Sequence, residues 1–199
     1  MKKRLLLLSV GGFLLITACD KQESESDFRS DPQLKSGSAE MGAFNNQVSP
    51  GNVNGQKVLN FRAHLDGGQE VPPRETQATG QAVFRLSRDG KELHYKLLVA
   101  NLENIVQAHI HVAGIGVNGP VVTWLYPSAP PAMLIPGVTN GPLHEGVITD
   151  ANLVGLLAGS KVADLVDLMA ANNTYVNIHT SLYPGGEIRG QIFGKVPVE

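Results

Sequence analysis

Apolar and polar residues alternate along much of the chain after residue 57, and this period of two limits the fold more than any other feature. From Val58 to Leu65, the side chains of Phe61, Ala63 and Leu65 would share one face, with polar residues on the other. Successive side chains of a strand point to opposite faces, so this segment is predicted to be a strand with one buried side. Further short segments that suit strands follow at 82–86, 93–99, 106–112, 121–125, 175–180 and 187–193.

Turn signals separate these segments. Asp89 and Gly90 lie between two alternating segments, which indicates a hairpin. Pro184, Gly185 and Gly186 predict a turn before the last strand. The Pro-rich stretch 127–142 is expected to be a long surface loop.

Residues 149–171 depart from the two-residue period and carry apolar residues at helical spacing. A helix is expected to begin near Thr149 and Asp150 and to end at Asn172, either unbroken or as two short helices divided at Gly159 and Ser160. The predicted fold is therefore mainly all-β. We expect an antiparallel Ig-like β-sandwich or open barrel with a short helical insertion.

Charge and cysteine content exclude several classes of protein. The chain has 16 Lys and Arg against 18 Asp and Glu. No basic run is long enough to follow a phosphate backbone, so nucleic acid is not an expected partner. The single Cys excludes an internal disulfide framework. Hydrolase, phosphate-loop and dinucleotide motifs are absent, so the sequence does not favour an enzyme.

The N-terminus has the features of an export signal. Basic residues at positions 2–4 precede the uncharged segment Leu5–Ala18, which is shorter than the roughly 20 residues of a membrane-spanning helix. The segment Ile16–Cys19 resembles the bacterial lipobox, which implies cleavage of a signal peptide at 1–18 and lipidation of Cys19. The expected location is the cell envelope, on a membrane held through the N-terminal lipid, with the leaflet left open.

Between this signal and the first strand, the chain is polar. Residues 19–56 are rich in Ser, Gly, Asn, Gln and charged residues and have no sustained period. Such a segment buries too little apolar surface to order itself, so it is predicted to be a disordered tether. The folded domain is then expected at 57–195.

Two closely spaced histidines are the strongest chemical signal. His109 and His111 would project from the same side of a strand, with Cα atoms about 6.5 to 7 Å apart. His179 lies on a later alternating segment, again opposite the aliphatic residues, and is the natural third ligand. Three imidazoles at one spot on the outside of the sandwich would suit Cu or Zn. Metal affinity would then weaken as pH falls through about 6.5, the reference histidine pKa.

Other residues could complete this site, and a simpler interpretation stays open. A fourth position could be water, Glu70, Glu187 or His94. Glu187 and Arg189 share a face of the last strand and could orient a histidine or bridge neighbouring strands. The alternative for the three histidines is that they are solvated or hydrogen-bonded residues that orient loops. The remaining histidines, His64 and His144, are expected at the surface, as His94 is if it is not a ligand.

Several motifs together are similar to those of the CHRD domain family, whose repeats were first named from chordin. The similarity covers nearly all of the predicted folded part. The motifs are Gly68–Pro73 (GQEVPP), Thr79 and Gly80, Ala108–His111 (AHIH), Gly119, Gly146 and Tyr175–Gln191 (YVNIHTSLYPGGEIRGQ). The resemblance implies an Ig-like β-sandwich in an extracytoplasmic protein, and it secures a fold better than an activity.

Two functions follow as expectations. The first is a lipid-anchored binding module of the cell envelope, with an envelope protein or glycan as partner and a candidate histidine metal site. The alternative is a copper- or zinc-dependent redox or metal-handling protein, because the His-x-His is also similar to that of the copper–zinc superoxide dismutases. The bridging histidine, zinc loop and cysteine pair of those enzymes have no counterpart here.

Overall fold

The structure is a computed structural model that describes residues 52–53, 56–57 and 60–195. The predicted signal peptide, Cys19 and most of the predicted tether lie outside the described residues. The strands are β1 (Asn52–Val53), β2 (Gln56–Lys57), β3 (Asn60–Asp66), β4 (Thr79–Leu86), β5 (Leu93–Val112), β6 (Val121–Tyr126), β7 (Ile135–Ile148), β8 (Thr174–Thr180), β9 (Ile188–Gln191) and β10 (Phe193–Lys195). The described part also contains the α-helix α1 (Val162–Ala170) and the 3-10 helices η1 (Gly67–Gln69), η2 (Asp150–Asn152) and η3 (Gly155–Leu157). Within these ranges, no helix has the length and apolarity to cross a bilayer.

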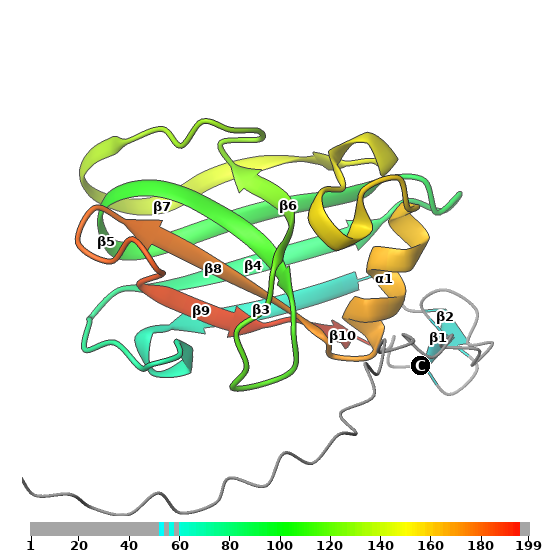
Figure 1. Cartoon of the computed structure of the whole chain (residues 1–199), viewed down its shortest axis with the longest axis horizontal. Coiled ribbons are helices and arrows are strands. Elements are labelled where there is room, and N and C mark those ends of the chain that lie inside the picture. Colours follow the sequence, from blue (N-terminus) through cyan, green and yellow to red (C-terminus); the bar gives the residue numbers. More distant parts are fainter. Residues whose placement is uncertain (1–51, 54–55, 58–59, 196–199) are drawn as a thin grey trace, which may run out of the picture. The chain divides into compact units, whose positions relative to one another are not determined.

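All strand pairs are antiparallel, as expected for an all-β fold. The main sheet has the order β10-β3-β4-β5-β8-β9, and β6 and β7 each pair with β5 (Figure 1). β3 also pairs with β9, through Asp66 and Arg189, so the sheet curls back on itself like a barrel. Gly190 permits this close approach, because a Cβ atom there would overlap the carbonyl oxygen of His64. β1 and β2 pair with each other at the end of the predicted tether.

β5 is the central strand and corrects one prediction. The segments 93–99 and 106–112, expected as two strands, are parts of one strand of 20 residues. Asn101 and Asn104 have positive φ angles of 56° and 53°, and the register with β7 shifts around them. Asn tolerates this conformation better than most residues. These irregularities interrupt the alternation without ending the strand, so the sequence pattern shows two pieces.

The apolar faces predicted from alternation form the core. In β3, Phe61, Ala63 and Leu65 are buried, while Asn60, Arg62 and His64 are exposed. The first half of β5 alternates in the same way, and β4 pairs with it across the predicted hairpin. β8 and β9 form the other predicted hairpin. Every residue of both strands is buried, so these strands are covered on both faces.

Two other expectations need correction. The stretch 127–142 is only partly a loop, because β7 begins at Ile135 and pairs along β5. β7 tolerates Pro136 and Pro142 because it lies at an edge of the sheet and needs hydrogen bonds on one side only. The expected last strand 187–193 is divided into β9 and β10.

The helical insertion has the predicted place but a later start. Residues 150–152 and 155–157 form 3-10 turns, and α1 begins only at Val162, after the predicted break at Gly159. The carboxylate of Asp150 accepts a hydrogen bond from the backbone nitrogen of Val162, so it stabilises the start of α1. Asn172 follows the helix with a positive φ of 57°, which agrees with the predicted end.

Candidate metal centre

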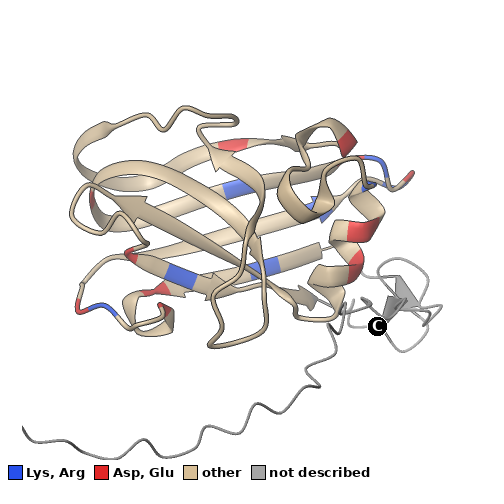
Figure 2. Ribbon diagram, in the orientation of Figure 1, with Lys and Arg blue, Asp and Glu red and all other residues tan. Residues whose placement is uncertain are grey.

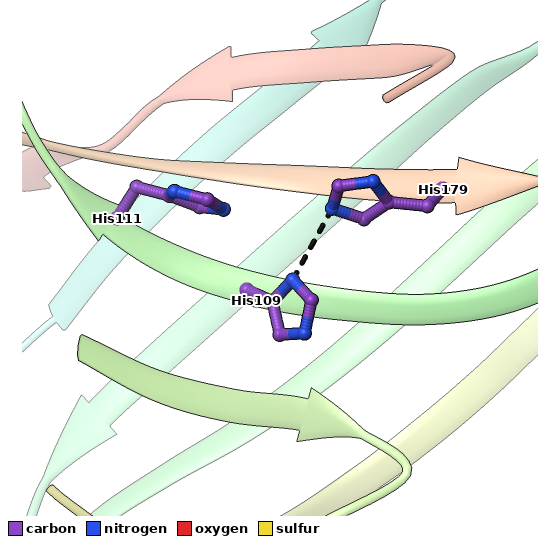
Figure 3. A group of neighbouring side chains, drawn as sticks. All are labelled: His109, His111 and His179. Carbon is purple, nitrogen blue, oxygen red and sulfur yellow. Dashed lines mark hydrogen bonds between the residues drawn. The ribbon is translucent and has the colours of Figure 1, made fainter. Parts of the chain in front are cut away.

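The structure brings His109, His111 and His179 together. His109 and His111 lie on β5 and His179 on the adjacent β8, and one ligand atom from each lies within 4.8 Å of those of the other two. Figure 3 shows the three rings turned toward one another. The Nδ1 atom of His109 is 3.2 Å from the Nε2 atom of His179. The two-residue spacing and the antiparallel pairing of β5 with β8 are enough to produce this cluster.

The expectation of a site on the outside of the fold is wrong. The side chains of His109, His111 and His179 are only 2%, 8% and 7% exposed. The ring of Trp124, on β6, packs edge to face against His109, with a centroid distance of 4.4 Å. Residues 113–119 cover His111 from another side, through the carbonyl of Gly119. The polar face of β5 and β8 is therefore buried by β6 and by the connection between β5 and β6, which are close to β5 in sequence but distant from β8.

Backbone carbonyls fix the tautomers of two rings. The Nδ1 atom of His111 is 2.8 Å from the carbonyl oxygen of Gly119, and the Nδ1 atom of His179 is 2.8 Å from that of Pro184. A carbonyl oxygen only accepts hydrogen bonds, so both Nδ1 atoms carry a proton and donate it. The Nε2 atoms of the neutral rings are then free of protons. That is the form in which imidazole binds a metal ion.

The donor set is electrically neutral. β6 and β8, which lie on either side of this part of β5, carry no charged residue (Figure 2). Burial lowers the pKa of His109 to about 3, with smaller effects from His179 and His111. Burial is also the main cause that lowers the pKa values of His111 and His179. The reference pKa of 6.5 therefore does not describe these three rings, and metal binding is now expected to weaken only at a lower pH.

These shifts predict that the metal-free chain loses stability in acid. A buried histidine with a lowered pKa stays neutral in the folded state, whereas the unfolded chain takes up protons below pH 6.5. The contribution to stability is thus complete above about pH 6.5 and is lost as pH falls toward 3. Urea denaturation between pH 7.5 and 4 should show a falling unfolding free energy. The variant His109→Gln should fall less steeply, and an identical slope in both proteins would contradict the assignment.

Arg189, Tyr175 and His111 form a stack of three side chains. The guanidinium carbon of Arg189 lies 3.4 Å from the ring centroid of Tyr175, and the Tyr175 ring stacks on His111 at 4.8 Å. Arg189 is 1% exposed and donates hydrogen bonds to Asn118 Oδ1 and to the carbonyls of Gly114 and Val117. Arg189 therefore links residues 113–119, which include the Gly119 carbonyl that orients His111, to the Tyr175 ring that stacks on His111.

The other predicted site residues lie in different places. Both carboxylate oxygens of Glu187 accept hydrogen bonds from threonine hydroxyls, those of Thr76 and Thr180, so the carboxylate ties two segments together. His94 lies fifteen residues before His109 on the same strand, with its Nε2 atom 3.3 Å from the carboxylate of Glu92 and both side chains exposed. Neither of them belongs to the group of ligand atoms around His109.

Glu70 is buried at the end of η1. Its side chain is 5% exposed, and its Oε1 atom has no hydrogen-bond partner in the described part of the chain. Burial raises its pKa to about 7, although the charge of Arg189 acts in the opposite direction. His64 is exposed as expected, whereas His144 is partly buried, with Nδ1 3.1 Å from the hydroxyl of Tyr95.

Sequence reasoning missed three residues of the site. Asn177 lies on the same face of β8 as His179, two residues earlier, so the alternation could have identified it. Trp124 and Gly119 act from other segments of the chain; Gly119 is among the family motifs but carries no side chain that would suggest a role in the site, and no local pattern marks Trp124. A Cβ atom at Gly119 would overlap the backbone of Val112, which explains the glycine beside the carbonyl that orients His111.

Comparison with known proteins identifies a domain family. The family model of the CHRD domain matches residues 61–192, about two thirds of the chain. No curated protein and no solved structure matches at a significant level.

Proposed function

The chain belongs to the CHRD domain family, and we propose that it is a binding module of the cell envelope whose ligand is a copper or zinc ion. His109, His111 and His179 are the proposed ligands. Cleavage before Cys19 and lipidation of this residue would hold the module on a membrane, with an envelope protein or glycan as a further proposed partner. The lipobox-like segment and the polar segment after it support this location.

One observation carries the metal proposal: two of three converging imidazoles are held in the metal-binding tautomer by backbone carbonyls. A histidine that only stabilised a loop would not need its second nitrogen turned toward two other rings. The Nε2 atom of His111 is buried without a hydrogen-bond partner in the described residues. The distance of 3.2 Å between His109 and His179 suits two nitrogens that each bind one ion at about 2.1 Å.

Redox activity is the second candidate. An all-imidazole donor set suits copper, which supports it. A redox enzyme must also let its substrate reach the ion. The three rings are at most 8% exposed, and Trp124 covers one of them, which favours binding over turnover.

We predict that the purified full chain binds close to one equivalent of Cu or Zn. Trp124 is the only tryptophan, so its fluorescence should report copper binding beside His109. Replacing one of three ligands should weaken binding by about 100-fold or more, beyond the loss typical of an outer partner. Elemental analysis and fluorescence titration of His111→Ala would measure this loss.

His94→Ala is the matched control, because it removes an exposed histidine from the same strand. It should bind the ion as the unmodified chain does. A full chain that takes up neither metal, or a His111→Ala variant with unchanged affinity, would rule out the proposed site. A chain that binds the ion but reduces or oxidises no small substrate would support the binding module over the redox candidate.

A further inference from the structure

Asn177 lies on the same face of the sheet as the three histidines. It is paired directly with His109 across the β5–β8 ladder and lies two residues before His179 on the same face of β8. His111 is its diagonal neighbour on β5. Directly opposed and diagonal residues on one face of a sheet are within contact of one another. The amide of Asn177 therefore borders all three imidazoles.

The amide oxygen of Asn177 is buried without a partner in the described part of the chain. Asn177 is 3% exposed, and its Oδ1 atom has no hydrogen-bond partner among the described residues. Burying such an oxygen without a partner costs about 1 to 3 kcal/mol. Amide oxygens in protein interiors are normally paired, so an unpaired one in the middle of a polar cluster needs a cause.

The neighbouring ring atom is also an acceptor. His111 donates through Nδ1 to Gly119, so its Nε2 atom carries a lone pair, and this atom likewise has no partner in the described part. Asn177 is the diagonal neighbour of His111 across the β5–β8 ladder, so its amide is within reach of this ring atom. Two buried acceptors that face each other repel unless a donor or a cation lies between them.

The nitrogen end of the Asn177 amide lies beside Gly186. At Gly186, a Cβ atom would overlap Oε1 of Glu70 and lie 2.9 Å from Nδ2 of Asn177. The Nδ2 atom of Asn177 and the Oε1 atom of Glu70 therefore both lie against Gly186, and the absent side chain of this residue leaves room for them.

We propose that Asn177 is the fourth ligand of the metal site and contacts the ion through Oδ1. The assignment rests on the proposed function. It gives the site three imidazole nitrogens and one neutral oxygen. Copper accepts an amide oxygen as a weak fourth ligand beside three stronger ones, and zinc is normally four-coordinate. The weak ligand completes the coordination without adding charge to a buried site.

Two substitutions of similar size should change metal affinity in opposite directions. Asn177→Asp retains the oxygen and gives it negative charge, so it should bind the divalent ion more tightly than the unmodified chain. Asn177→Leu removes the oxygen and should weaken binding about tenfold, at the lower end of the losses seen for metal-site partners. Isothermal titration with Zn²⁺ and Cu²⁺ at pH 7.5 would give the affinities of the full-length variants. If Asn177→Leu does not fold, as judged by circular dichroism, Asn177→Ala takes its place.

A spectroscopic readout separates a ligand from a merely structural residue. Co²⁺ in place of Zn²⁺ gives a visible absorption band whose position depends on the coordinating atoms. Asn177→Asp should shift this band, whereas His94→Ala should leave it unchanged. Affinities of the Asp and Leu variants that differ by less than about threefold, or an unshifted band, would overturn the assignment of Asn177. Uptake of no ion by the unmodified chain would instead overturn the proposed function itself, and the assignment with it.

Discussion

Gly190→Ala is expected to destabilise the fold by about 4 kcal/mol, in the range reached by only a few point substitutions. Gly190 lies on β9 where the sheet closes against β3. A Cβ atom would overlap the carbonyl oxygen of His64, lie 2.7 Å from its carbonyl carbon and lie 3.1 Å from Cγ of Leu65. Backbone atoms in a sheet cannot move aside as the end of a side chain can, so the two strands must separate. Urea denaturation of both proteins would measure the loss.

Gly185→Ala provides the control for this change. The nearest atom to the added methyl group would be a nitrogen of Arg74 at 3.9 Å, an ordinary contact. The unfolding free energy of this variant should stay within about 0.5 kcal/mol of that of the unmodified chain. A Gly190→Ala protein as stable as the Gly185→Ala protein would contradict the close approach of β9 and β3.

Arg189→Met should cost about 4 kcal/mol of stability and also weaken metal binding. Methionine keeps an apolar stem but donates no hydrogen bond, so the carbonyls of Gly114 and Val117 lose a partner. Each buried acceptor left unpaired costs about 1 to 3 kcal/mol, and the interaction with Tyr175 is lost as well. Because Tyr175 stacks on His111, we expect a loss of metal affinity of about 10 to 100-fold.

Arg62→Met separates this effect from a general loss of positive charge. Arg62 is an exposed residue of β3, and its replacement should change the unfolding free energy by no more than about 0.5 kcal/mol. Denaturation and metal titration of the two variants would be carried out in parallel. If Arg189→Met retained full metal affinity in a folded chain, the stack would not position His111.

The sequence predicted those features that depend on local alternation. The buried face of β3, the β4–β5 and β8–β9 hairpins and the meeting of His109 with His179 all follow from a two-residue period and antiparallel pairing. Local alternation could not predict that β5 continues through its irregular middle, because Asn101 and Asn104 break the pattern but not the strand. β7 was missed for a related reason, since its prolines are typical of loops and are tolerated only at a sheet edge.

The burial of the histidines was beyond the reach of sequence patterns for a different reason. A polar face on a strand is usually exposed to solvent, whereas here it packs against other segments of the protein. Trp124 and the segment that ends at Gly119 are brought over this face by the path of the chain between β5 and β6. The tautomers of His111 and His179 depend on carbonyls in turns, whose direction no residue type encodes.

The two carbonyls that hold His111 and His179 belong to separate connections, one between β5 and β6 and one between β8 and β9. Under the proposed function, each connection sets the orientation of one histidine ring, His111 or His179, independently of the other. Changes in either connection would alter how fast an ion is released while the donor atoms stay the same. Homologous domains with identical histidines could then differ in ion residence time, and the differences would trace to residues that never touch the ion.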